Sequence, residues 1–191
     1  MDSVSLNGVR IALLIEDNYQ VLEGWFTRLR LQGAGASLTV VGSGTKSSYG
    51  SEEGYPMTAD KAASEVSVDE FDAVIVPGGY APDNMRMHPE MVALVRDAFE
   101  AGKLVCAICH AGWMLISAGA LRGRRATGYT PIKDDVVNAG GTWVDDQPVV
   151  EDGNVITSRT PDDLPYFCDA IISYLERAQA AVQPLAVGAD A

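Results

Sequence analysis

Short, almost wholly apolar runs alternate along the chain with longer segments whose apolar residues recur every three or four positions. Apolar runs of strand length are typical of parallel strands covered on both faces, and the three-to-four spacing is typical of amphipathic helices. The strand-like runs are residues 9–15, 36–41, 71–76 and 103–108. The helix-like segments are residues 21–32, 89–101, 110–118, 131–138 and 161–178. This alternation predicts a three-layer α/β/α sandwich with a mostly parallel sheet.

The remaining segments have weaker patterns. Residues 125–129 and 142–145 are expected to form short strands, and residues 148–158 a hairpin. Residues 42–56 are rich in Gly and Ser, which indicates a loop or a small hairpin. Residues 180–191 have no strong pattern and are expected to form a loose tail. We therefore expect one domain over residues 1–179, followed by that tail.

The first and the last helix-like segments, residues 21–32 and 161–178, each carry an apolar face that is expected to pack against the sheet. In residues 161–178 this face includes Cys168, and Cys106 falls within an apolar strand, so both cysteines are expected to be buried and inert. In residues 21–32 a broad apolar face is expected. It comprises Val21, Leu22, Trp25, Phe26, Leu29 and Leu31.

Composition narrows the classes of function. The 191 residues carry a formal net charge of −12, which argues against a surface for nucleic acid or anionic membranes. The sequence has no signal segment and no apolar run long enough to span a bilayer. Its 3 cysteines lack the spacing of a zinc site, and we expect no metal and no cofactor. A reducing cytoplasm is the simplest location.

The segment KLVCAICHAGWMLISAG, residues 103–119, joins a predicted strand directly to a predicted helix. Cys109 lies at the junction, which is the arrangement of a nucleophile elbow. The N-terminus of a helix favours a thiolate over a thiol. Cys109 is therefore the candidate nucleophile, and we expect its ionised form to be stabilised.

Other candidate residues follow two further strands, and the carboxyl ends of parallel strands meet at one edge of a sheet. Glu23, one turn into the first helix, is the first choice for a carboxyl group beside the thiol, and Glu16 is the second. The backbone N–H of His110 and the turn at Gly78 and Gly79 can supply donors for an oxyanion. Adjacency alone is weak evidence that the imidazole of His110 contacts the sulfur.

Several segments together resemble the ThiJ/PfpI superfamily, in its PfpI (intracellular protease I) branch. These are EDNYQVLE, FDAVIVPGGYAPDNMR, AICHAGWMLISAGALRGRRATGY, PIKDDVVNAGGTWVD and GNVITSRTPDDLPYF. The resemblance spans about residues 9–176. It implies a flavodoxin-like sandwich, similar to class I glutamine amidotransferases, with a cysteine nucleophile.

By position, the resemblance assigns roles to individual residues. Cys109 matches the family nucleophile, Glu23 the carboxyl that hydrogen-bonds its sulfur, and Gly79 and the His110 amide the oxyanion donors. In the PfpI branch the histidine after the cysteine pairs with an acidic residue of a neighbouring subunit. That residue is Asp83 here, one methylene shorter than the glutamate of the archaeal protease. Gln20 stands where relatives often carry a second acid.

The resemblance implies a cysteine-dependent enzyme that acts on carbonyl groups. Its substrates would be peptides, glycated proteins or small dicarbonyls, so peptidase, deglycase and glyoxalase-III-like activities all stay open. The alternative is a non-catalytic redox sensor or chaperone-like stress protein whose Cys109 becomes oxidised. Because Asp83 would serve a neighbour, a homodimer is expected, with a hexamer as the further option.

Two other classes are excluded by particular residues. The segment IALLIEDN resembles the opening of response-regulator receivers, but the strand 71–76 ends in Pro77 rather than a phosphoacceptor Asp. A glutamine amidotransferase would need a late His-x-Glu, and no histidine follows His110.

Overall fold

The computed structural model describes residues 6–182. One sheet with strand order β10-β11-β7-β6-β1-β2-β5 forms its centre. Those strands are β1 Arg10–Ile15, β2 Ser37–Gly42, β5 Lys61–Ala62, β6 Ala73–Val76, β7 Leu104–Ile108, β10 Val149–Asp152 and β11 Val155–Ser158. All neighbours pair in parallel except β10 and β11, which form an antiparallel hairpin. The predicted hairpin is therefore confirmed.

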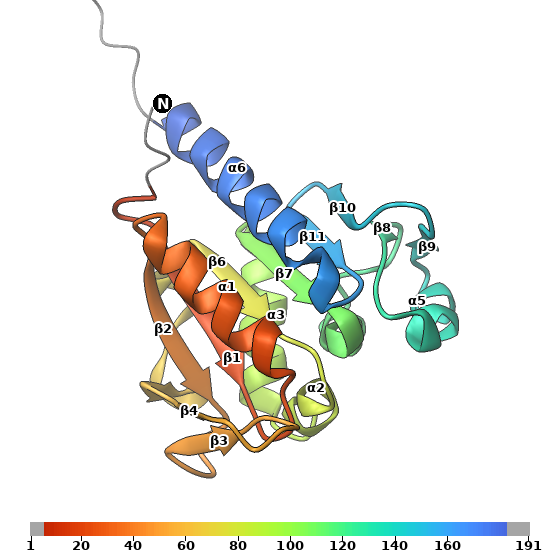
Figure 1. The fold of residues 1–191 in the computed structure, drawn as a ribbon. Helices are drawn as coiled ribbons and strands as arrows, with labels where there is room; N and C mark the ends of the chain where they lie inside the picture. Colours follow the sequence, from red (N-terminus) through yellow and green to blue (C-terminus); the bar gives the residue numbers. More distant parts are fainter. Residues whose placement is uncertain (1–5, 183–191) are drawn as a thin grey trace, which may run out of the picture.

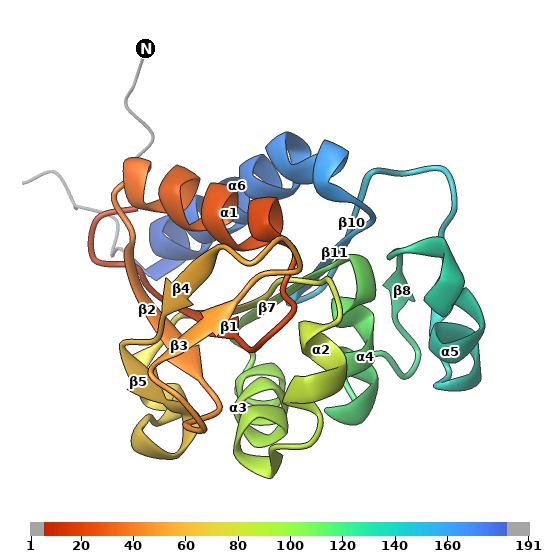
Figure 2. The ribbon, with the colours of Figure 1, turned by 60° about the horizontal axis from the view of Figure 1, so that its bottom comes forward.

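Helices cover both faces of this sheet, as Figures 1 and 2 show. Helices α1 Val21–Gly33 and α6 Leu164–Val182 pack side by side on one face, while α3 Pro89–Glu100 and α4 Gly112–Ser117 cover the other. The strands β1, β6 and β7 between these layers are fully buried apart from Arg10. The predicted α/β/α sandwich is confirmed, because apolar runs of this kind are stable only between two covering layers.

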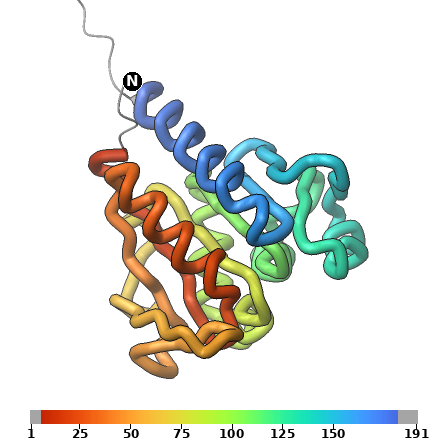
Figure 3. The backbone as a smooth tube through the Cα atoms, viewed as in Figure 1, coloured from red at the N-terminus to blue at the C-terminus, as the bar shows by residue number. Residues whose placement is uncertain are grey.

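Small elements extend the two ends of the sheet (Figure 1). At one end β3 Ser48–Gly50 and β4 Pro56–Thr58 pair as a hairpin, as expected for residues 42–56. At the other end β8 Arg125–Ala126 and β9 Thr142–Trp143 pair beside helix α5 Lys133–Asn138. Both of these strands are shorter than predicted. Figure 3 traces how the chain leaves the sheet for these excursions and returns to it.

Helix α1 buries only part of the face predicted for it: Leu31 is buried and Trp25 packs against the core, but the other large residues are not. Its buried residues are Glu23, Gly24, Thr27 and Leu31, whereas Leu22, Phe26 and Leu29 are exposed, Leu29 by 60%. The pattern of apolar residues was misleading because the buried side of this helix carries a carboxyl group and a hydroxyl group. The exposed residues form a stripe along the helix, defined here as the α1 stripe, at spacings of four and three.

The last helix matches its predicted apolar face but not its predicted end. Leu164, Phe167, Cys168 and Leu175 are buried as expected. Helix α6 continues to Val182, so residues 180–182 of the predicted tail are helical. The rest of that tail lies outside the described residues. No helix in residues 6–182 is long and apolar enough to cross a membrane.

Candidate active site

Cys109 lies on a strained turn between strand β7 and the 3-10 turn Cys109–Ala111 that leads into α4. Its φ of 61° is in the left-handed region, which costs a non-glycine residue about 1–3 kcal/mol. Pairing of β7 with β6 and β11 on its two sides, and a 3.2 Å hydrogen bond from the Tyr129 amide to the Cys109 carbonyl, hold the turn. The backbone thus has the geometry expected of a nucleophile elbow.

The turn after β6 brings two glycines against this elbow. A Cβ on Gly78 would lie 2.6 Å from the Cys109 Cβ and 2.7 Å from Glu23 Oε2, so only glycine lets the three groups meet. Gly79 has a φ of 72°, and a Cβ there would lie 2.4 Å from the carbonyl oxygen of Asn18. The amides of Gly79 and His110 both hydrogen-bond the Cys109 sulfur and lower its pKa. The two expected oxyanion donors are therefore brought together at the sulfur.

Glu23 lies in the first turn of α1, which Gln20 caps by accepting a 3.0 Å hydrogen bond from the Glu23 amide. Its side chain is fully buried, and Oε2 accepts a 2.7 Å hydrogen bond from the Gly78 amide. The helix N-terminus favours a carboxylate by at most about 2 kcal/mol. Burial outweighs this and raises the pKa of Glu23 to about 8. Glu23 is thus a neutral carboxylic acid beside Cys109 at pH 7.

Burial opposes the expected thiolate of Cys109, which stays a prediction. Cys109 is only 7% exposed, and this burial is the main cause that raises the pKa of its thiol to about 12. The charge of Glu23, when that group is ionised, acts in the same direction. The helix that should have favoured the thiolate, α4, spans 6 residues and follows a 3-10 turn. The dipole of such a short helix lowers the thiol pKa by less than the loss of hydration around the sulfur raises it. Burial and the helix N-terminus thus act on the thiol pKa in opposite directions.

His110 provides a base within reach of the thiol proton. Its Nδ1 lies 3.5 Å from Cys109 Sγ, so the contact that adjacency could not establish is present. Three aromatic rings enclose the imidazole: Tyr80 is stacked at 5.4 Å between ring centroids, and Trp113 and Tyr129 are tilted at 4.9 Å. Burial lowers the pKa of His110, which keeps the imidazole neutral near pH 7.

Asp83 lies apart from this group within one chain. It is in the short helix α2 Ala81–Met85, and its side chain is 69% exposed. Its carboxylate lies 4.0 Å from Arg86 Nη1 and forms no hydrogen bond with His110 in the described chain. This position leaves the expected pairing with a neighbouring subunit as a prediction.

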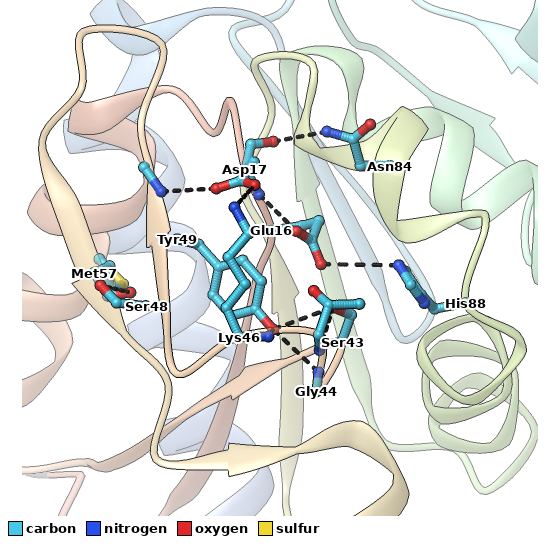
Figure 4. Close-up of polar contacts among 12 residues, drawn as sticks. Glu16, Asp17, Ser43, Gly44, Lys46, Ser48, Tyr49, Met57, Asn84 and His88 are labelled. Atoms are coloured by element: carbon cyan, nitrogen blue, oxygen red, sulfur yellow. Dashed lines mark hydrogen bonds and ion pairs between the residues drawn. The ribbon is translucent and has the colours of Figure 1, made fainter.

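Glu16, the second choice for the acid, belongs to a different cluster (Figure 4). Its Oε1 accepts a 3.0 Å hydrogen bond from the Asp17 amide, and Oε2 lies 3.9 Å from His88 Nε2. Asp17 pairs with Lys46 and accepts a hydrogen bond from the Gly50 amide, while its carbonyl accepts one from Asn84. This cluster anchors the loop between β1 and α1, and Glu23 alone supplies the acid beside the sulfur.

That loop in turn holds the glycine turn in place. The carbonyl of Asn18 accepts hydrogen bonds from the amides of Tyr80 and Ala81, and Gln20 donates to the carbonyl of Gly78. Asn18 has a φ of 64°, and with Cys109 it is one of two non-glycine residues with positive φ in the part of the chain that the structure describes. Both strained residues thus lie at the candidate site.

A cavity of about 500 Å³ opens at the opposite edge of the sheet, where Gly8, Lys103 and Tyr174 are among its lining residues. Its charged groups already have partners: Asp72 pairs with Arg10, and Lys103 donates to the carbonyls of Val68 and Phe71. Across residues 6–182, no cluster of three or more His, Cys, Asp or Glu side chains is arranged to hold a metal ion. The chemistry is therefore concentrated at Cys109.

The aromatic enclosure of His110 and the role of Asn18 were missed from the sequence. Tyr80 directly follows the glycine turn, which was the available signal. Tyr129 lies 20 positions beyond Cys109 in the sequence and carried no signal of its own, because the chain passes through α4 and β8 before it returns to the elbow.

An α/β/α sandwich with a cysteine on a strained turn, beside a buried acid, defines the class of protein. The DJ-1/PfpI family model matches residues 9–174. The chain is 39% identical to the deglycase PfpI of Pyrococcus furiosus, covering 82% of this chain and 93% of that protein. It is 40% identical to protein/nucleic acid deglycase 2 of Escherichia coli, covering 83% and 92%. The crystal structure of Drosophila melanogaster DJ-1beta superposes with a TM-score of 0.83 at 29% identity, covering 90% and 94%. The chain belongs to the DJ-1/PfpI family.

We expect Gly79→Ala to slow alkylation of Cys109 several-fold at pH 8. The new Cβ would overlap the Asn18 carbonyl and displace an amide that stabilises the thiolate. Mass spectrometry after timed iodoacetamide treatment measures the rate. Gly102→Ala is the matched control, because Gly102 has a φ of 71° but no atom within 4 Å of its Cβ position. Equal rates in the two variants would contradict the assignment of the Gly79 amide.

We expect the stability of the protein to fall as pH rises from about 4.5 to about 8. The folded pKa of Glu23 is raised, so over this range the unfolded state releases a proton that the folded state keeps. The loss should be on the order of a few kcal/mol and should disappear in Glu23→Gln. Urea unfolding across this pH range measures it. Glu90→Gln, at an exposed glutamate in the first turn of α3, should keep the wild-type slope; a Glu23→Gln curve parallel to wild type would refute the buried neutral acid.

Proposed function

We propose that the chain is a cysteine-dependent deglycase that acts on carbonyl adducts of proteins or on small dicarbonyls. The observation that carries this proposal is the placement of a buried neutral acid, two backbone amides and an imidazole around one sulfur. The names of the relatives at about 40% identity agree with it: those from Pyrococcus furiosus and Escherichia coli are deglycases.

In the proposed first step, Cys109 Sγ adds to the carbonyl carbon of the substrate. His110 Nδ1 takes the thiol proton as the S–C bond forms and returns it to the new oxygen, giving a hemithioacetal. The amides of Gly79 and His110 donate to that oxygen while it is negative; one such donor contributes about 3 kcal/mol to transition-state stabilisation. Glu23, as a neutral acid, donates a hydrogen bond to the sulfur and stabilises the developing thiolate.

Peptide hydrolysis could use the same groups through a thioester, so the two activities differ in the substrate rather than in the nucleophile. A deglycase must admit a modified side chain of a protein, whereas a peptidase must admit extended backbone. The deglycase names of the relatives favour the first, and the experiment below includes both substrates.

We expect Cys109→Ala to abolish the release of unmodified lysine amines from methylglyoxal-treated albumin and of unmodified guanidine groups from methylglyoxal-treated N-acetylarginine. Cys168→Ala, at a buried cysteine on α6, is the control and should retain wild-type activity. A fluorogenic peptide, assayed in parallel, tests the peptidase alternative. If wild type and Cys109→Ala process every substrate equally slowly, the enzyme proposal fails. Peroxide titration of Cys109 followed by mass spectrometry then tests the redox-sensor alternative.

We also propose that the site is completed by a second copy of the chain, through Asp83. The carboxylate is exposed, His110 has no acidic partner among the described residues, and the α1 stripe leaves apolar side chains in water. Such stripes commonly mark protein interfaces. A homodimer, or a hexamer built from such contacts, would supply the missing acid.

Activity per chain should therefore fall on dilution, in step with dissociation measured by analytical ultracentrifugation. Asp83→Asn should reduce kcat/KM by about 10-fold or more, since it removes the carboxylate that orients the base. Asp134→Asn, at another exposed acid, is the control and should keep wild-type activity. Monomers that remain fully active would rule out the shared site.

A further inference from the structure

The residue that follows the oxyanion glycine also reaches the candidate base. Tyr80 is 60% exposed, a large fraction for an aromatic ring, and its hydroxyl makes no hydrogen bond within the described residues. Its one aromatic contact is with the His110 imidazole, at 5.4 Å between centroids and 26° between planes. This offset stack is among the arrangements that flat rings prefer.

The other two residues around His110 are held by hydrogen bonds, Trp113 through its ring and Tyr129 through its backbone. Trp113 Nε1 donates a 2.9 Å hydrogen bond to Asp135 Oδ2. The backbone of Tyr129 is held by its amide, which donates to the Cys109 carbonyl, and by its carbonyl, which accepts from the Ile132 amide. The backbone of Tyr80 is held in the same way: its amide donates a 2.8 Å hydrogen bond to the Asn18 carbonyl, and its carbonyl accepts a 3.1 Å one from the Asp83 amide. What sets Tyr80 apart is exposure: its ring is 60% exposed, against 39% for Tyr129, although it stacks on the imidazole.

We propose that Tyr80 is a positioning residue for His110: its ring stacks on the imidazole, holds Nδ1 toward Cys109 Sγ and keeps water from the ring. The catalytic part of this inference rests on the proposed function, in which His110 is the base. The stack itself does not. Because Gly79 and Tyr80 are adjacent, the same turn would position both the Gly79 amide, as oxyanion donor, and the His110 imidazole, as base.

The charged groups near His110 are not the cause of its lowered pKa. On α2, Asp83 and Arg86 face each other at 4.0 Å. On α5, Asp135 accepts from Trp113, and on the elbow the neighbouring group is the Cys109 thiol. Burial is the cause of the lowered pKa of His110, and the exposed ring of Tyr80 is one of the three that provide it.

The test is an NMR titration of the histidine ring protons, which the sequence makes unusually clean. The chain has 2 histidines, His110 and His88, and a His110→Ala spectrum assigns them. In Tyr80→Ala the pKa of His110 should rise toward its ordinary value of about 6.5, while that of His88 stays unchanged. Tyr80→Phe keeps the stacked ring and should match wild type. Tyr166→Ala removes a tyrosine that is 61% exposed on α6 and should also match.

Three results would overturn the proposal: an unchanged His110 in Tyr80→Ala, an equal shift of His88, or a shift in Tyr80→Phe as large as that in Tyr80→Ala. If Tyr80→Ala does not fold, Tyr80→Leu replaces it, with the same expected direction. In activity assays Tyr80→Ala should lower kcat/KM by about 10-fold and move the acid limb of its pH profile upward, with Tyr80→Phe unchanged. Absence of the titration shift defeats this inference and leaves the proposed function standing. Full activity in Cys109→Ala defeats the proposed function and the catalytic part of this inference, but not the stacking of Tyr80 on His110.

Discussion

The candidate site depends on one buried contact, the hydrogen bond from the Gly78 amide to the Glu23 carboxyl. It joins helix α1 to the turn after β6, directly behind the Cys109 elbow. A Cβ at Gly78 would overlap both Cys109 and Glu23, so the three groups can meet only where the turn has no side chain. Because the carboxyl group of Glu23 is buried away from water, it stays neutral and places no negative charge beside the Cys109 sulfur.

This constraint changes the chemistry that a cysteine elbow suggests. A helix N-terminus alone would favour a resting thiolate, yet burial of the sulfur outweighs a helix of 6 residues. Burial therefore opposes a thiolate in the absence of substrate. A nearby neutral imidazole, a carboxylic acid and two amides can all stabilise the charge once a carbonyl arrives. Reactivity would then depend on the substrate, as differential binding of the transition state requires.

The sequence predicted the structure correctly where the spacing of apolar residues matches the residues that the fold buries. The sandwich, the elbow and the face of α6 could be predicted because apolar runs and spacing there match burial. Helix α1 was misread because its buried side carries Glu23 and Thr27, while Leu22, Phe26 and Leu29 lie in water. Such a reversal is expected where a functional group occupies a core position. The enclosure of His110 could not be predicted, since Tyr80, Trp113 and Tyr129 approach it from three separate segments.

The same reversal connects the interior of the site with the surface. Because Glu23 and Thr27 face inward, Leu22, Phe26 and Leu29 face the solvent, and the α1 stripe follows from that orientation. Burying such a stripe against another chain would gain about 25 cal/mol per Å² of apolar area removed from water. The acid inside and the apolar stripe outside are therefore two consequences of how one helix is turned on the sheet, and the proposed second chain would cover the stripe.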